Sequence, residues 1–371
     1  MNRILTTLGA LALTTTAGFS GGLDRSGQSV GALFEKGDYV ELSFGRVSPS
    51  ISGVQLVPAG PGSVVGAQSG NMAQAYTQFG MAVKTQLTDS LALGVILDQP
   101  FGANVSYPTG TGYFAQGSTA TLSTTAVTAI LKYTTATNIS VYGGLRHETM
   151  DAVAAVPFVA NYKVRSDQAA DVGYLVGVAY EKPEIALRVA LTYNSKISHD
   201  FNTMESSLLT ANENVPGTTT VNSPQSVNLE FQSGVAKDTL VFGSVRWADW
   251  SNFVIDPTNY PAPTPLVSYD TDTVTYSLGV GRRFSEKLSG SISFGYEKKA
   301  GGFAANLGPT DGRASITIGA AYTTAKKVKI SGGVSYVQIG DAQTTLNGVT
   351  AASNFNGNTA IGVGMKISYS F

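Results

Sequence analysis

The chain has 371 residues, of which 13% are charged and 42 are glycine, with no cysteine and a formal net charge of −1. A soluble globular protein carries about 25% charged residues, so much of this surface faces something other than water. The small net charge gives no reason to expect a nucleic-acid partner. The absence of cysteine excludes a disulfide framework and thiolate metal sites.

The N-terminal segment has the layout of a secretory signal. Arg3 supplies a positive start, residues 4–17 are mostly apolar, and Ala17, Gly18 and Ser20 are small residues that suit cleavage. We therefore predict a signal peptide over residues 1–20. The apolar stretch is too short to span a bilayer, and no later segment has about 18 uninterrupted apolar residues.

Residues 21–37 precede the first predicted strand. Val30, Leu33 and Phe34 are spaced like the apolar stripe of a short helix, and Gly37 is placed to end it. The alternative is a disordered leader, which the apolar stripe argues against.

From residue 38 to residue 371 the pattern is that of β-strands. Apolar and small or polar residues alternate with period two, as in Val40, Leu42 and Phe44 near the start and Val363, Met365 and Ile367 near the end. The segments are rich in β-branched and aromatic residues, and no long helical period competes.

The connections alternate between short and long along the whole chain. Tight turns lie at 88–90, 135–138, 181–184, 236–238, 285–287 and 325–327. Loops rich in Gly, Pro, Asn and Ser lie at about 51–72, 108–117, 153–168, 201–219, 256–269, 300–311 and 342–355. This rhythm predicts an all-β fold, a 14-stranded antiparallel transmembrane barrel with tight periplasmic turns and long external loops.

A closed barrel satisfies every backbone group within lipid, with the apolar face toward lipid and the small, polar face toward the lumen. Residues 21–37 then start at the periplasmic mouth, and the lumen is the space that they can fill as a hatch. The soluble alternative, a large β-sandwich, does not explain the signal, the low charge and the short–long rhythm together.

The third strand, residues 90–108, is interrupted in its middle. Its alternation is clean to Leu97 and then meets Asp98, Pro100, Phe101 and Gly102. Proline removes a ladder hydrogen bond and glycine permits a bend, so pairing should break locally. This break is either an opening in the wall or an ordinary bulge near the outer rim.

Two of the long loops are unusually apolar for a surface in water. Exposed apolar patches mark binding surfaces, so these loops are candidates for first contact with a hydrophobic ligand; alternatively they pack together as a lid. The candidate contact residues are Val156, Phe158 and Val159 in the 153–168 loop and Met204, Leu208 and Leu209 in the 201–219 loop.

Inside the lumen, Leu33 and Phe34 of the hatch are candidates to touch an apolar ligand. Lys84, Arg146 and Arg188 lie on inward strand faces and could meet a carboxylate. The alternative is that these cations pair with lumen acids such as Glu41, Glu148 or Asp171.

Signals for catalysis are weak. The two histidines, His147 and His199, lie in no Gly-x-Ser-x-Gly or His-Glu-x-x-His setting. The sequence has no phosphate loop, dinucleotide fingerprint or metal cluster, so we expect no enzyme, no cofactor and no metal.

Three stretches resemble the FadL/TodX family of outer-membrane transporters for long-chain fatty acids and other hydrophobic compounds. They are DYVELSFGRVSPSISG at 38–53, SPQSVNLEF at 223–231 and VRWADWSNF at 245–253. The final SYSF is common to outer-membrane proteins generally. The chain departs from the family at Gly31-Ala32-Leu33, where members often carry Asn-Pro-Ala.

The resemblance implies a barrel plugged by an N-terminal hatch in the outer membrane of a Gram-negative bacterium. It implies ligand capture on outer loops and exit beside a kinked third strand, with residues 98–102 as a lateral gate. We therefore expect passive uptake of long-chain fatty acids or similar hydrophobic molecules by a monomer surrounded by outer-membrane lipid. The alternative is a general diffusion porin for small polar solutes.

Overall fold

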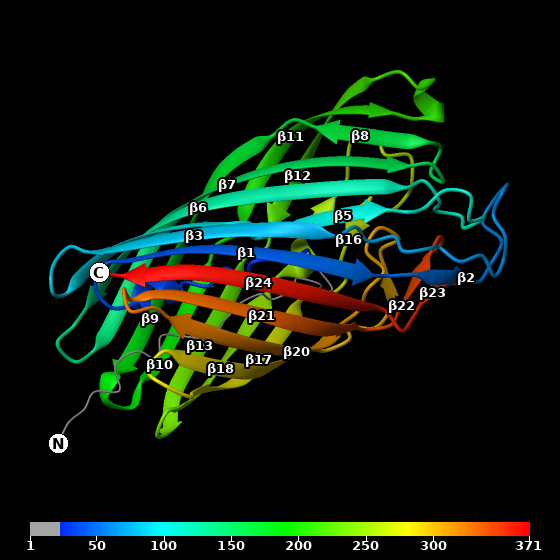
Figure 1. The fold of residues 1–371 in the computed structure, drawn as a ribbon. Coiled ribbons are helices and arrows are strands. Elements are labelled where there is room, and N and C mark those ends of the chain that lie inside the picture. Colours follow the sequence, from blue (N-terminus) through cyan, green and yellow to red (C-terminus); the bar gives the residue numbers. More distant parts are fainter. Residues whose placement is uncertain (1–22) are drawn as a thin grey trace.

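The computed structural model describes residues 23–371, so the predicted signal peptide lies outside the described residues. The fold is all-β, and its main element is an antiparallel barrel of 14 strands, four of which are interrupted and so form two segments each (Figure 1). In chain order the barrel strands are β1 (Tyr39–Ser50), β3 (Tyr76–Gln86), β4 (Leu91–Asp98) with β5 (Gly102–Ser106), β6 (Thr119–Thr134), β7 (Ile139–Val156), β8 (Tyr162–Ser166) with β9 (Ala169–Lys182), β10 (Leu187–Asn194) with β11 (Ile197–Ser206), β12 (Val215–Ser223) with β13 (Ser226–Ala236), β14 (Thr239–Ala248), β17 (Thr273–Arg283), β18 (Leu288–Glu297), β20 (Arg313–Thr323), β21 (Val328–Ile339) and β24 (Thr359–Ser370).

The sheet closes on itself. β1 pairs on one side with β3 and on the other with β24, in a register that runs from Tyr39 opposite Ser370 to Ser50 opposite Thr359. Closure leaves the barrel without an exposed edge, which is the condition for a sheet to cross lipid. Among residues 23–371 there is no helix of the length and apolar character needed to cross a bilayer.

The long connections at one end of the barrel form smaller secondary-structure elements. A four-stranded sheet combines β2 (Gly53–Gln55), β19 (Phe303–Ala304), β22 (Ala342–Thr345) and β23 (Ala351–Phe355). A separate hairpin pairs β15 (Val254–Ile255) with β16 (Val267–Ser268). Four 3₁₀ turns complete the described chain: η1 (Gly31–Phe34), η2 (Pro183–Ile185), η3 (Leu208–Thr210) and η4 (Trp250–Asn252).

The two faces of the wall exchange character part of the way along several long strands, as β6 and β1 show. On β6 the outward residues change from Tyr133, Leu131 and Val127 to Thr125, Ser123 and Thr121, while the inward residues change from Lys132 and Thr128 to Leu122 and Ala120. β1 does the same, with Leu42 and Phe44 outward below and Arg46 and Ser48 outward above, opposite the buried Val47. The outer surface of the barrel next to the tight turns, which we call the lower part, therefore suits lipid. The outer surface next to the long connections, which we call the upper part, suits water, and the interior there is apolar.

This exchange corrects the predicted loop boundaries. The segments expected as loops at 153–168 and 201–219 are mostly strand, because β7 extends to Val156, β8 begins at Tyr162, β11 extends to Ser206 and β12 begins at Val215. Only the tips 157–161 and 207–214 remain as connections. The sequence prediction placed the end of each strand where its outward residues stop being apolar. The strand in fact continues above the membrane, with polar residues outward and apolar residues inward.

The loss of folding stability caused by a charge on the outward face of β6 should depend on its position along the strand. Arg at the bilayer midplane of a barrel costs about 2–4 kcal/mol, and near the interface about 0–1 kcal/mol. We expect Leu131→Arg to lower the free energy of unfolding by about the larger amount and Ser123→Arg by about the smaller. Urea titrations of the protein folded into lipid vesicles measure both, and equal losses would contradict the assigned boundary.

Candidate functional site

Residues 23–37 lie inside the barrel and form a hatch. Val30 and Leu33 are fully buried and cluster with the inward-facing Ile130, Tyr142 and Leu175. The Leu33 side chain occupies the space in front of Gly94, where a Cβ would lie 2.3 Å from Leu33 Cδ2. Gly94 is thus needed for the hatch to approach the wall. Gly37, with φ +64°, ends the segment as the sequence predicts.

Three cations from the wall, Lys84, Lys132 and Arg188, hold the end of the hatch around Phe34 and Gly37. The Phe34 ring lies 4.7 Å from Lys132 Nζ and 5.0 Å from the Arg188 guanidinium carbon, so it makes cation–π contacts with both. Lys84 Nζ donates to the carbonyls of Glu35 (2.9 Å) and Gly37 (2.8 Å). Leu33 and Phe34, predicted as ligand contacts, are therefore packed against the wall.

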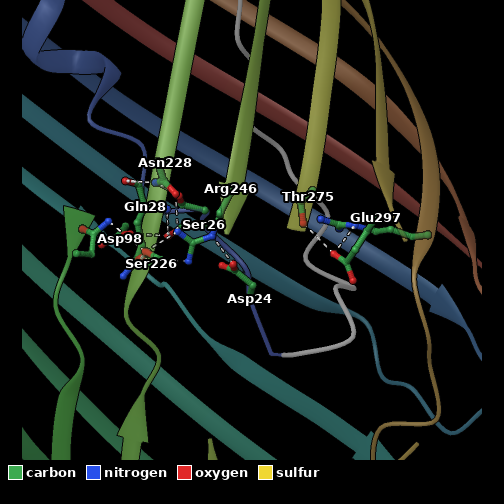
Figure 2. A network of polar contacts seen from close by, with 12 residues as sticks. Asp24, Ser26, Gln28, Asp98, Ser226, Asn228, Arg246, Thr275 and Glu297 are labelled. Carbon is green, nitrogen blue, oxygen red and sulfur yellow. Dashed lines mark hydrogen bonds and ion pairs between the residues drawn. The ribbon is translucent and has the colours of Figure 1, made fainter. Parts of the chain in front are cut away.

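A polar belt crosses the lumen at the upper end of the hatch (Figure 2). The Arg246 guanidinium on β14 pairs with Asp24 at 2.5 Å and donates to Gln28 Oε1 at 3.1 Å, so it joins the hatch to the wall. The same guanidinium donates to Ser226 Oγ and Asn228 Oδ1 on β13. Because Asp24 and Arg246 are both at most 8% exposed, this is a buried ion pair.

The wall is broken next to the hatch, at the residues that the sequence singles out. β3 pairs with β4 only up to Met81 opposite Leu97, and pairing resumes at Ala73 opposite Val105. On the other side, Asp98 pairs with Ala126 and Gly102 with Ser123, so four steps along β4 and β5 match three along β6. This is a one-residue β-bulge.

The first described residues of the hatch form hydrogen bonds with backbone groups of the bulge that have no partner on the neighbouring strand. Arg25 N donates to Pro100 O (2.7 Å), and Gly102 N donates to Leu23 O (2.9 Å). Ser26 Oγ donates to Asp98 Oδ2 (2.5 Å). The hatch is thereby attached to both ends of the bulge from the lumen side, and moving it would free these groups.

A cavity of about 160 Å³ passes through this break, and we call it the window. Its lining includes hatch residues such as Ser29 and Ala32 and also Phe44 and Phe79, which lie on the outward face at 48% and 38% exposure. Gln99 Oε1 accepts from Phe79 N at 3.0 Å and so caps one backbone group that has no strand partner there. The window therefore connects the hatch with the lipid-facing surface.

Above the polar belt lies a second cavity, of about 70 Å³, which we call the chamber. Among residues 23–371, those that line it carry no charge. It lies in the upper part of the barrel, where the inward face is apolar, and its walls include Leu122, Met150, Phe201, Val221 and Leu307. An uncharged apolar molecule can be buried there without leaving a charge unpaired.

The predicted capture residues are divided between two environments. Val156 is 1% exposed, and Phe158 and Val159 pack against the same apolar cluster, with Phe158 5.2 Å from Phe114. Leu208 and Leu209 are exposed at the tip between β11 and β12, and Met204 lies on the outward face of β11. These two groups do not form one surface, and their role in capture remains a prediction.

The predicted lumen charges are engaged with protein groups. Glu41 pairs with Lys366 (3.1 Å), and Arg146 Nε donates to Thr128 Oγ1 (3.0 Å). The fully buried His199 lies 3.2 Å from Glu148 and 3.4 Å from Asp171. Within residues 23–371 no cluster of His, Asp or Glu has the arrangement of a metal site.

Sequence reasoning missed the Asp24–Arg246 pair, whose two members are 222 residues apart. The inward position of Arg246 on a strand next to small polar residues was the available signal, but its partner lies outside any strand pattern. It also missed the chamber, whose signal is the inverted alternation in the upper part of strands such as β6.

A plugged, closed 14-stranded barrel with an apolar outer belt defines a bacterial outer-membrane transport channel. The sequence model of the outer membrane transport proteins OMPP1/FadL/TodX matches residues 32–371, and the chain belongs to this family. Its place is the outer membrane of a Gram-negative bacterium, and the family consists of channels for hydrophobic compounds. A search of curated protein sequences finds no match.

Solved structures support the same fold. A FadL homologue from Pseudomonas aeruginosa superposes with a TM-score of 0.73 at 12% identity, covering 92% of each chain. The toluene transporter TbuX from Ralstonia pickettii gives 0.64 at 14% identity, covering 92% of this chain and 91% of that one. The toluene transporter TodX from P. putida gives 0.63 at 14%, with the same coverage.

Removing Arg246 should loosen the hatch. Arg246→Ala leaves Asp24 buried without its ion-pair partner, which costs about 3–5 kcal/mol, so the hatch should leave its position for part of the time. Planar-bilayer recordings should then detect ion current that the wild type lacks. Arg283→Ala is the matched control, because Arg283 pairs with Asp238 in the wall away from the hatch; a current equal to that control would contradict the anchoring role.

Proposed function

We propose that this protein takes up hydrophobic molecules passively across the outer membrane and releases them sideways into the bilayer through the window. The observation that carries the proposal is the placement of the hatch. It separates an apolar chamber above from a cavity that reaches the lipid-facing surface beside β4 and β5. A ligand that displaces residues 23–26 from the bulge would open one into the other.

The driving force is burial of apolar surface. Each methylene that leaves water for an apolar environment contributes about 0.8 kcal/mol, so a hydrophobic ligand gains this free energy on entering the chamber and keeps it on entering lipid. A sugar or an ion gains nothing at either step. The lateral path is therefore selective without an energy source, and this distinguishes the protein from the alternative, a general diffusion porin, which needs a continuous water-filled lumen.

Two substrate classes remain within this proposal. Long-chain fatty acids are the class expected from the sequence, and Arg25 supports them because its guanidinium lines a cavity that adjoins the chamber near Asn104 and Tyr76. The chamber itself favours uncharged molecules, because its lining has no cation. Uptake of labelled oleate and labelled toluene by cells that lack other such transporters would separate the two.

We propose further that the protein acts as a monomer and performs no catalysis. The barrel closes within a single chain, so the passage needs no partner subunit. Blue native electrophoresis in mild detergent would test the oligomeric state.

Restoring the ladder at the bulge should stop release. Pro100→Thr supplies a backbone N–H where proline has none, and threonine favours strand pairing. Gly102 is left unchanged, because a Cβ there would lie 2.4 Å from the Arg25 guanidinium carbon and would push the hatch off the bulge. We expect Pro100→Thr to fold and to lose most uptake of the transported substrate. Ser106→Val, at the far end of β5, is the control, and uptake by Pro100→Thr at the control's rate would exclude a lateral exit.

A further inference from the structure

A cavity on the outer side of the protein lies between two connections to which no role has been assigned. It has a volume of about 520 Å³ and runs between residues 268–273, before β17, and residues 298–311, between β18 and β20. We call it the outer groove. It does not include the 153–168 or 201–219 segments, where the sequence places first capture.

The lower end of the outer groove lies at the membrane surface. Its lining includes Tyr276 and Tyr296, which face each other across β17 and β18 on the outward side and are 47% and 54% exposed. Aromatic side chains at this position of a barrel strand form the interfacial girdle. A molecule dissolved at the lipid surface can thus reach the groove without crossing the external loops.

The upper end of the outer groove meets the chamber. Tyr269 and Gly308 line the outer groove, the chamber and the cavity next to Arg25. Tyr269 is held by Trp250, 5.5 Å away, and Phe253, 6.0 Å away. Burial raises the pKa of Tyr269, so the phenol stays neutral. These two residues form the constriction between outside and inside.

The lining of the outer groove carries more carboxylates than ammonium groups. Its lining has four carboxylates against two lysines: Asp270, Asp272, Glu297 and Asp311 against Lys298 and Lys299. Several of these hold the walls in place. Asp311 accepts from the backbone of Ala300 and Gly301, and Asp272 accepts from Trp247 Nε1.

From this geometry we infer that the outer groove is an intake port for uncharged, compact hydrophobic molecules, such as those with a single aromatic ring, which enter the chamber between Tyr269 and Gly308. The inference rests on the proposed function and adds the point of access and the charge of the molecule admitted. Such a molecule moves from the membrane surface to the chamber past aromatic side chains, with no charge to leave unpaired.

Gly308 provides the test of the path. A Cβ there would meet only Tyr269 Oη, at 3.9 Å, so Gly308→Ala fits and Gly308→Phe fills the constriction. We expect Gly308→Phe to slow toluene uptake about tenfold, the factor that an added barrier of about 1.4 kcal/mol produces, and Gly308→Ala to transport like wild type. Val349→Phe, at a site 82% exposed in another loop, controls for added surface apolarity.

The outcomes separate the two proposals. Unchanged toluene uptake by Gly308→Phe, together with lost uptake by Pro100→Thr, would overturn the intake port and leave lateral release intact. If wild-type cells take up toluene no faster than cells without the protein, the result counts against both the intake port and lateral release for toluene. The binding measurement described next then tests the intake port by itself.

Binding can be followed without transport, because the two tryptophans of the chain flank the outer groove and its constriction. Titration of the detergent-solubilised protein with bromobenzene should quench tryptophan fluorescence along a saturable curve. Tyr269→Ala, which widens the constriction, should alter the midpoint of that curve. The intake port would be overturned if quenching rose linearly with bromobenzene concentration, as it does for free tryptophan, and was the same in the wild type and in Tyr269→Ala.

Discussion

The structure depends on one constraint: the outer face of the wall meets two different solvents. In lipid the outward residues must be apolar and the backbone fully paired, whereas above the membrane the outward residues meet water. Because side chains of a strand alternate between faces, a strand that crosses the boundary exchanges its two patterns, as β6 does between Val127 and Thr125. The consequence is an apolar interior in the part of the barrel that stands in water, which is where the chamber is found.

The two ends of the hatch lie in the two different parts of the barrel interior. Its lower half lies among inward-facing polar and charged residues, where Lys84 binds its carbonyls, and its upper end is tied by Arg246 to the belt below the chamber. Its first residues complete the hydrogen bonding of the bulge at Pro100 and Gly102. A single short segment thus packs inside the lumen and completes the hydrogen bonding of the break in the wall, which is why the proposed release requires that segment to move.

Much of this could be predicted from the sequence, since period-two alternation and the short–long rhythm of connections are local signals. They were enough for the barrel, its 14 strands and the break at residues 98–102. The loop boundaries at 153–168 and 201–219 were wrong, because alternation in water inverts rather than ends. The Asp24–Arg246 pair and the lining of the window depend on contacts between distant segments, which no local pattern encodes. The chamber had a local signal, the inverted alternation of strands such as β6, which was not recognised. The positions of Leu33 and Phe34 against the wall depend in turn on Gly94 and on two cations from other strands.

The central claim is that the water-surrounded part of the barrel encloses a binding chamber for hydrophobic molecules. Diffraction from crystals grown with bromobenzene, recorded at the bromine absorption edge, tests it most directly. The account predicts an anomalous peak within the cavity bounded by Leu122, Met150 and Phe201. Bromine found solely in the detergent layer around the outward face, with that cavity empty at saturating ligand, would contradict it.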